Sequence, residues 1–191
     1  MTQIFLFAPD GIAADKLLAC AKAAVTAGDC ASIVVPGSTA QATVAGLQAL
    51  GLATLLRDFT ASHVHELEAD GLHLTNTANL KESRETLKNE SLGVFAGTSR
   101  HLAMDAAEAG ADYVAFAQTK QFAGEPLIGW WQAVTQLPSV AIDPVEPESL
   151  AKLLTQNPDF IRPSDAMWQD AQMAENIIST LNVRMGGGGK K

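Results

Sequence analysis

Cysteine is scarce in this sequence of 191 residues, which contains only Cys20 and Cys30. Cys20 lies in an Ala-rich stretch typical of a helix, and Cys30 stands just before an apolar run typical of a strand. Two cysteines with no histidine cluster nearby form no disulfide framework and make a poor metal site. We therefore interpret both as small buried hydrophobic residues.

Basic residues are also in short supply, with 13 Lys and Arg against 21 Asp and Glu and a net charge of −8. A surface of this sign repels nucleic acids and anionic membranes, so we expect neither as a partner.

No apolar run reaches the ~18 residues that a membrane span needs. The N-terminal stretch "QIFLFAPD" is too short for a secretory signal. We therefore expect a cytoplasmic protein.

What the sequence does contain is a regular alternation. Apolar residues make up 47% and charged residues 18%, which is typical of a globular protein. Short apolar runs alternate with Ala- and Leu-rich amphipathic stretches from end to end. The runs predict strands at 4–7, 32–35, 53–56, 72–75, 92–95, 112–116, 139–142 and 159–161. The stretches predict helices near 12–27, 39–50, 60–69, 79–89, 99–109, 126–136, 146–156 and 165–184.

Strict alternation of strand and helix requires parallel strands with helices outside them. Eight such units predict an α/β fold, a (β/α)₈ TIM barrel of minimal length, as a single domain over 1–185. A doubly wound open sheet is the alternative, but "GSTAQATVAG" after the second strand lacks the GxGxxG spacing of dinucleotide-binding sheets. Residues 186–191, "GGGGKK", predict a flexible tail.

Glycines and one aspartate mark predicted helix ends. Gly51, Gly71 and Gly110 each follow a predicted helix, where a left-handed residue is favoured. Asp165 is the predicted N-cap of the last helix. The apolar side chains of that helix form one stripe, made of Met167, Ala171, Ala174, Ile178 and Leu181.

Active sites of such barrels gather at the carboxyl ends of the strands. The polar candidates there are Asp10, Ser38, Arg57, Asp58, Thr75, Asn76, Thr77, His101, Gln118, Thr119, Lys120, Asp143, Arg162, Ser164 and Asp165. Lys120 and Arg162 are the cations best placed to meet a phosphate or an anionic leaving group, unless they are solvated rim residues. The pair Arg57–Asp58 is suited to an anion or a metal, or equally to a structural ion pair.

His73 is the histidine that strand alternation directs into the barrel. Leu72 and Leu74 suit the helix-packed face of their strand, which leaves His73 on the inner face. A buried histidine that is merely hydrogen-bonded is the alternative to a substrate contact.

Four segments in matching order resemble the thiamine phosphate synthase and thiazole tautomerase family. "IFLFAPD" is similar to the family's first strand, "ADGLHLTN" to its fourth, "EAGADYVAFAQTK" to its sixth and "LPSVAI" to its seventh. The resemblance implies a protein of thiamine biosynthesis that joins hydroxymethylpyrimidine diphosphate to thiazole phosphate and releases diphosphate with the help of Mg²⁺. Small phosphorylated molecules are then the expected partners.

The resemblance and the strand-end positions together give the expected site. We expect Lys120 and Asp58 to be catalytic, with Asp58 also binding the metal. The expected substrate-binding residues are Arg57, His73, Asn76, Gln118, Arg162 and Ser164.

Several working parts of the family are replaced in this chain. The loop after the second strand, "SIVVPGST", has no cation, and the family's Mg²⁺-binding Asp after the fourth strand falls at Thr77 or Ala78. The family's phosphate-binding Gly-Gly-Ile after the seventh strand becomes Asp143-Pro144. Proline has no N–H, and the aspartate charge repels a phosphate.

Three functions therefore stay open. The first is a divergent thiamine phosphate synthase. The second is a thiazole tautomerase-like isomerase, for which His73, His101 or Lys120 would move the proton. The third is a non-catalytic ligand-binding or regulatory relative. The sequence does not fix the oligomeric state, and a homo-oligomer is compatible with it.

Overall fold

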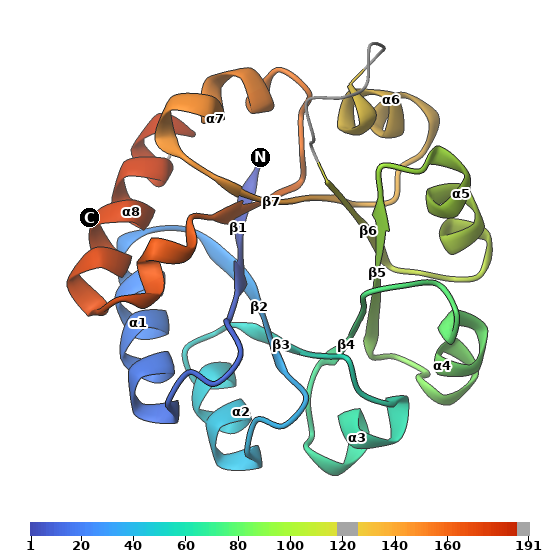
Figure 1. Cartoon of the computed structure of the whole chain (residues 1–191), viewed down its shortest axis with the longest axis horizontal. Helices are drawn as coiled ribbons and strands as arrows, with labels where there is room; N and C mark the ends of the chain where they lie inside the picture. Colours follow the sequence, from blue (N-terminus) through green and yellow to red (C-terminus); the bar gives the residue numbers. More distant parts are fainter. Residues whose placement is uncertain (118–125, 187–191) are drawn as a thin grey trace.

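Eight parallel strands close into a barrel with helices on its outside, within residues 1–117 and 126–186, which this computed structural model describes (Figure 1). Each strand pairs with the next one in the chain, and β8 pairs with β1. The strands are β1 (Gln3–Phe7), β2 (Cys30–Pro36), β3 (Ala53–Arg57), β4 (Gly71–Leu74), β5 (Ser91–Gly97), β6 (Tyr113–Phe116), β7 (Ser139–Val145) and β8 (Phe160–Pro163). The predicted TIM barrel is confirmed.

The helices follow the strands in strict order around the barrel (Figure 1). They are α1 (Ala14–Ala27), α2 (Gln41–Gln48), α3 (Ala61–Glu66), α4 (Leu80–Thr86), α5 (Arg100–Glu108), α6 (Leu127–Val134), α7 (Pro147–Leu154) and α8 (Ala171–Arg184), with a 3₁₀ helix η1 (Asp165–Trp168) before α8. Among these helices, all within the described residues, none has the length and hydropathy of a membrane span. Of the predicted tail, 187–191 lie outside the described residues.

Alternation along the strands separates two apolar cores. On β1, Ile4 and Leu6 belong to the core shared with the helices, whereas Phe5 and Phe7 belong to a second cluster inside the barrel. Other strands add to the inner cluster Val34, Leu55, Tyr113, Ala115, Val140 and Ile142. The barrel interior is therefore filled by side chains, and a ligand has access to it only from the ends of the strands.

An aspartate stands directly before each even-numbered strand: Asp29, Asp70, Asp112 and Asp159. Three of these carboxylates accept a backbone N–H near the start of the preceding odd-numbered strand, from Thr54 (2.8 Å), Leu92 (2.7 Å) and Ser139 (2.8 Å). Asp29 accepts from the side-chain amide of Gln3 on β1 (3.1 Å). Charge-assisted hydrogen bonds of this kind are among the stronger ones, so they fasten neighbouring strands at the amino end of the barrel.

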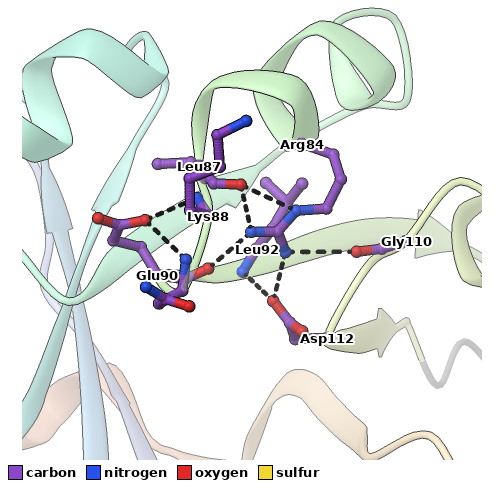
Figure 2. Close-up of polar contacts among 8 residues, drawn as sticks. Arg84, Leu87, Lys88, Glu90, Leu92, Gly110 and Asp112 are labelled. Carbon is purple, nitrogen blue, oxygen red and sulfur yellow. Dashed lines mark hydrogen bonds and ion pairs between the residues drawn. The ribbon is translucent and has the colours of Figure 1, made fainter.

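Arg84 makes the most extensive set of hydrogen bonds at this end of the barrel (Figure 2). From α4, its guanidinium donates to the carbonyl oxygens of Leu87 (2.7 Å) and Glu90 (3.1 Å) and to the Asp112 carboxylate (2.9 Å). The same carboxylate accepts the N–H of Leu92. The carbonyl group of Leu87 directly follows α4 and has no helical partner, so Arg84 provides its donor. Through Glu90 and Asp112 the same guanidinium joins α4 to the residues that precede β5 and β6.

The glycines at predicted helix ends divide into two kinds. Gly51 and Gly110 have φ angles of +86° and +91°, as the left-handed position after a helix favours. The prediction for Gly71 is wrong, because this residue begins β4 and a Cβ there would lie 2.1 Å from the carbonyl oxygen of Ser91. Glycine is required there because β4 and β5 lie too close together for a side chain, not because the position follows a helix. The left-handed residue after α3 is Glu68, with φ +53°.

The predicted helix 165–184 is in fact two elements. Asp170, in extended conformation, interrupts the helical backbone and caps α8, and its carboxylate accepts the N–H of Met173 at 2.8 Å. The prediction of Asp165 as this cap is therefore wrong, because its carboxylate is paired with Arg162 instead. Of the predicted apolar stripe, Ala171 is exposed, and the buried members are Met167, Ala174, Ile178 and Leu181.

Replacing Arg84 with methionine is expected to lower the free energy of unfolding by about 2–4 kcal/mol, because Asp112 loses its cation and the carbonyl groups of Leu87, Glu90 and Gly110 lose a donor. Arg184→Met is the matched control, since Arg184 donates to the Pro147 carbonyl at the exposed surface. Its loss is expected to cost about 1 kcal/mol or less. Urea unfolding followed by circular dichroism measures both, and equal losses would contradict the role given to Arg84.

Candidate functional site

One layer inside the barrel joins β4, β5 and β6. The strand register places His73 beside Gly93 and Gly93 beside Tyr113. A Cβ on Gly93 would lie 1.8 Å from Cζ of Tyr113, so the phenol ring occupies the space that a side chain on β5 would need. Tyr113 therefore crosses over β5, and its hydroxyl oxygen lies 2.8 Å from Nδ1 of His73. The two rings are stacked, with an interplanar angle of 18°.

Burial keeps both members of this pair neutral. His73 is 1% exposed, and its burial, together with the charge of Arg57, lowers its pKa to about 3. Burial, followed by the Asp112 carboxylate, raises the pKa of Tyr113 well above its usual value. The expectation that His73 points into the barrel is confirmed by these contacts. Its contact with a substrate stays a prediction.

Phe7, the last residue of β1, lies next to this layer. Its ring meets the imidazole of His73 edge to face, with centroids 5.7 Å apart and an interplanar angle of 86°. The indole N–H of Trp168, in η1, donates to the carbonyl oxygen of Phe7 at 2.9 Å. This oxygen lies beyond the last paired residues of β1 and β8, Ile4 and Ile161, so the indole takes the place of a strand partner. Phe7 is thus held through both its ring and its backbone.

Two arginines meet at the ring of Phe7. The guanidinium carbon of Arg57, at the end of β3, lies 4.8 Å from the ring centroid, and that of Arg162, on β8, lies 4.6 Å from it. Both distances are those of cation–π contacts. One nitrogen of each guanidinium also bonds to an acid beyond a strand end, Arg57 to Asp10 and Arg162 to Asp165, each at 2.6 Å.

Each of these guanidinium groups has one buried N–H donor without a hydrogen-bond acceptor among the described residues. The Nε atoms of Arg57 and Arg162 are buried, and neither donates a hydrogen bond to any residue in the described part of the chain. A buried N–H without an acceptor is costly, so an incoming acceptor gains most at these atoms. Two planar cations with unused donors fit an anion that carries several oxygens, such as a phosphate or diphosphate.

Asp58 follows Arg57 in a left-handed backbone conformation, with φ +57°, which is unusual for a residue other than glycine. The hydroxyl of Thr75 donates to one of its carboxylate oxygens at 2.7 Å, and the other oxygen lies 3.8 Å from Nε of Arg57. The next residue, Phe59, packs on Gly37, where a Cβ would lie 2.0 Å from the ring. The loops after β2, β3 and β4 therefore brace one another at the mouth of the barrel.

These residues do not by themselves make a magnesium site. Mg²⁺ demands oxygen ligands in octahedral geometry, usually one or two carboxylates together with water and phosphate oxygens. Across 1–117 and 126–186, no group of three or more His, Cys, Asp or Glu side chains is placed to hold a metal ion. Both oxygens of Asp58 already face Thr75 and Arg57, and the guanidinium would repel a divalent cation. We therefore derive no step through Mg²⁺, and the role of Asp58 as its ligand stays a prediction.

The loop after β4 is built for a turn. The side-chain oxygen of Asn76 accepts the N–H of Ala78 at 3.0 Å, and exposed or half-exposed uncharged residues fill residues 75–79. The seventh strand is longer than its predicted range 139–142, so Asp143 and Pro144 lie within β7 rather than in a loop after it.

The remaining predicted site residues are scattered. Ser164 is 8% exposed and lies between β8 and η1, two residues after Arg162 in the sequence. The side chain of His101 is 85% exposed, and its Nε2 lies 3.3 Å from a carboxylate oxygen of Asp105 on the same helix. Gln118 and Lys120 lie outside the described residues, so their roles stay predictions.

Sequence reasoning missed Phe7, Tyr113 and Trp168 as parts of the site. The alternation of "IFLF" was sufficient to place Phe7 on the inner face of β1. Its contacts with Arg57 and Arg162 have no local signal, because β1, β3 and β8 meet only in the closed barrel.

A family model described as thiamine monophosphate synthase matches residues 5–162 of the chain. The chain belongs to the thiamine monophosphate synthase family. Members of this family act on small phosphorylated substrates and use Mg²⁺. The prediction of a thiamine-phosphate-synthase-like protein is therefore confirmed.

Individual relatives within the thiamine monophosphate synthase family agree with this assignment. The thiamine-phosphate synthase of Erythrobacter litoralis is 41% identical over 56% of this chain, a match that spans 56% of that relative's length. The thiamine-phosphate synthase of Rhodospirillum centenum is 27% identical over 97% of this chain and 98% of its own. The solved thiamine phosphate pyrophosphorylase from Pyrococcus furiosus has a TM-score of 0.77 at 15% identity, over 95% of this chain and 94% of its own, and shows likeness of fold alone.

Stability is expected to fall on the acid side of neutrality because His73 must stay neutral in the folded protein. Its pKa is about 3 when folded and about 6.5 when unfolded, so below pH 6.5 the unfolded state binds a proton that the native state does not. The contribution of neutral His73 to the free energy of unfolding is complete above pH 6.5. It is lost as the pH falls towards 3, at up to about 1.4 kcal/mol per pH unit. Urea unfolding at several pH values compares the native protein with His73→Gln, which lacks this proton site. A stability difference that does not change with pH would contradict the account.

Proposed function

We propose that this protein forms thiamine phosphate from hydroxymethylpyrimidine diphosphate and thiazole phosphate. In this reaction the C–O bond between the pyrimidine methylene and its diphosphate breaks, and the diphosphate leaves with the bonding electrons. The thiazole nitrogen then forms a C–N bond to the same methylene carbon. Negative charge increases on the departing diphosphate, so the site must present cations and hydrogen-bond donors to it.

The observation that carries the proposal is the arginine pair at Phe7. Arg57 and Arg162 lie at the carboxyl ends of β3 and β8, the end of the barrel at which enzymes of this fold bind their substrates. Their side chains are 15% and 18% exposed, so their charges are only partly screened by water. We assign both to the diphosphate, with Ser164 and Asn76 beside the substrates. Lys120 and Gln118 complete the proposed set from outside the described residues.

The layer below the mouth gives the site a neutral floor. His73 and Tyr113 are uncharged and bonded to each other. The ring of Phe5 packs on that of Tyr113 with centroids 5.4 Å apart, and the ring of Phe160 packs on Phe5 at 5.9 Å. Such a floor excludes water from below, which protects a reactive pyrimidine cation from hydrolysis.

A non-catalytic binding protein is the second candidate, and one observation favours it. The described residues offer an anion receptor but no ready metal cluster. The tautomerase alternative is less well supported, because His73 is neutral and engaged and His101 is an exposed surface residue. A cytoplasmic location, a homo-oligomeric state and Mg²⁺ binding by Asp58 stay predictions.

Arg162→Met is expected to lower kcat/KM for thiamine phosphate formation by about 10²–10³-fold, because one donor to the leaving diphosphate is lost. The assay supplies both substrates and Mg²⁺ to the purified protein and detects product as thiochrome fluorescence. Arg184→Met removes the same charge from the exposed surface and is expected to keep full activity. An Arg162→Met protein as active as the native one would contradict the assignment. Absence of product from folded native protein would favour the binding function.

A further inference from the structure

We propose that Phe7 is a positioning residue that holds Arg57 and Arg162 together as a receptor for phosphoryl anions, and that Asp10 and Asp165 occupy this receptor until an anion displaces them. The anion then binds without Mg²⁺. The identity of the anion as a diphosphate rests on the proposed function, whereas the receptor itself rests on contacts among described residues.

Phe7 is the element that the two arginines have in common. Arg57 and Arg162 come from β3 and β8, which are not neighbours in the barrel, so strand pairing alone does not bring their side chains together. Like charges repel, and two guanidinium groups at one site need a compensating attraction. Asp10 and Asp165 supply part of it, and the Phe7 ring supplies a part that stays when the acids leave, since both guanidinium carbons lie within 5 Å of its centroid.

The platform is itself fixed in place. Trp168 bonds to the Phe7 carbonyl oxygen, and His73 packs edge to face against the ring. Phe7 is 9% exposed, so its ring has little freedom to move away from the guanidinium groups. A receptor whose cations are held in position before binding spends less free energy on ordering them when the anion arrives.

Asp10 and Asp165 are expected to compete only weakly with a phosphoryl anion for the two arginines. The side chains of Asp10 and Asp165 are 82% and 55% exposed, whereas those of their arginine partners are 15% and 18% exposed. Ion pairs with such exposed carboxylates contribute little. A phosphoryl group offers more oxygens than one carboxylate and is suited to bidentate contact with arginine. The buried Nε atoms donate to no described residue, although that of Arg57 lies 3.8 Å from a carboxylate oxygen of Asp58, and they become available to the anion once the acids have moved away.

The first experiment measures the affinity of inorganic pyrophosphate by calorimetry, with EDTA present to remove divalent metals. The variant Phe7→Leu keeps an apolar side chain but lacks the aromatic face, and its dissociation constant is expected to rise about threefold to tenfold. Phe7→Tyr keeps the face and is expected to stay near the native value. Equal affinities for the leucine variant and the native protein, with both shown to be folded, would overturn the role of Phe7.

The second experiment uses the same titration on variants that leave the platform intact. Asp10→Asn and Asp165→Asn are expected to bind pyrophosphate about threefold or more tightly, because a charged competitor becomes a neutral one. Asp105→Asn removes the same charge next to His101 on α5 and controls for net charge. Weaker or unchanged binding by both site variants, relative to that control, would overturn the role of the two acids.

Turnover assays separate this inference from the proposed function. Pyrophosphate binding that follows the expected order of variants, without formation of thiamine phosphate, would remove the proposed synthase activity and support the receptor. Formation of product with unchanged pyrophosphate affinity and unchanged KM in Phe7→Leu would support the synthase and remove the receptor.

Discussion

The site depends on one steric constraint, the absence of a side chain at Gly93. This gap lets the ring of Tyr113 cross β5 and bond to His73 inside the barrel. The imidazole in turn supports the ring of Phe7, at which both arginines of the mouth are held. Each contact fixes the next, so packing deeper in the barrel sets the positions of the two largely buried arginines at its mouth. A close-packed interior transmits such constraints because it has little free volume in which to absorb a shift.

The two ends of the barrel have different tasks. At the amino end, an aspartate before each even-numbered strand bonds to the preceding odd-numbered strand, and Arg84 adds its guanidinium to one of these carboxylates. These polar groups satisfy one another and contribute to stability. At the carboxyl end, two guanidinium groups keep buried donors that bond to no described residue. This division of stability and binding between the ends is general in TIM barrels, and here it locates the site independently of any family pattern.

The order of strands and helices and the inward direction of His73 followed from periodicity alone. The start of the last helix did not, because Asp165 and Asp170 are both suitable caps and only the fold pairs Asp165 with Arg162. Gly71 was predicted as the left-handed residue after a helix because a sequence does not show that Ser91 of the next strand lies against it. The arginine pair was predicted as two separate candidates. Its common platform, Phe7, lies in a third strand, and contacts among strands far apart in the chain leave no local signal.

In the proposed receptor, the buried Nε–H groups of Arg57 and Arg162 gain a phosphoryl acceptor when the anion binds. Arginine side-chain ¹⁵N–¹H resonances report on these two groups directly, with Arg184 as an internal reference on the surface. Titration with inorganic pyrophosphate in EDTA is predicted to shift both Nε–H resonances together and to saturate, while that of Arg184 stays in place. Two unmoved resonances at saturating pyrophosphate, or movement of the Arg184 resonance alone, would contradict the account.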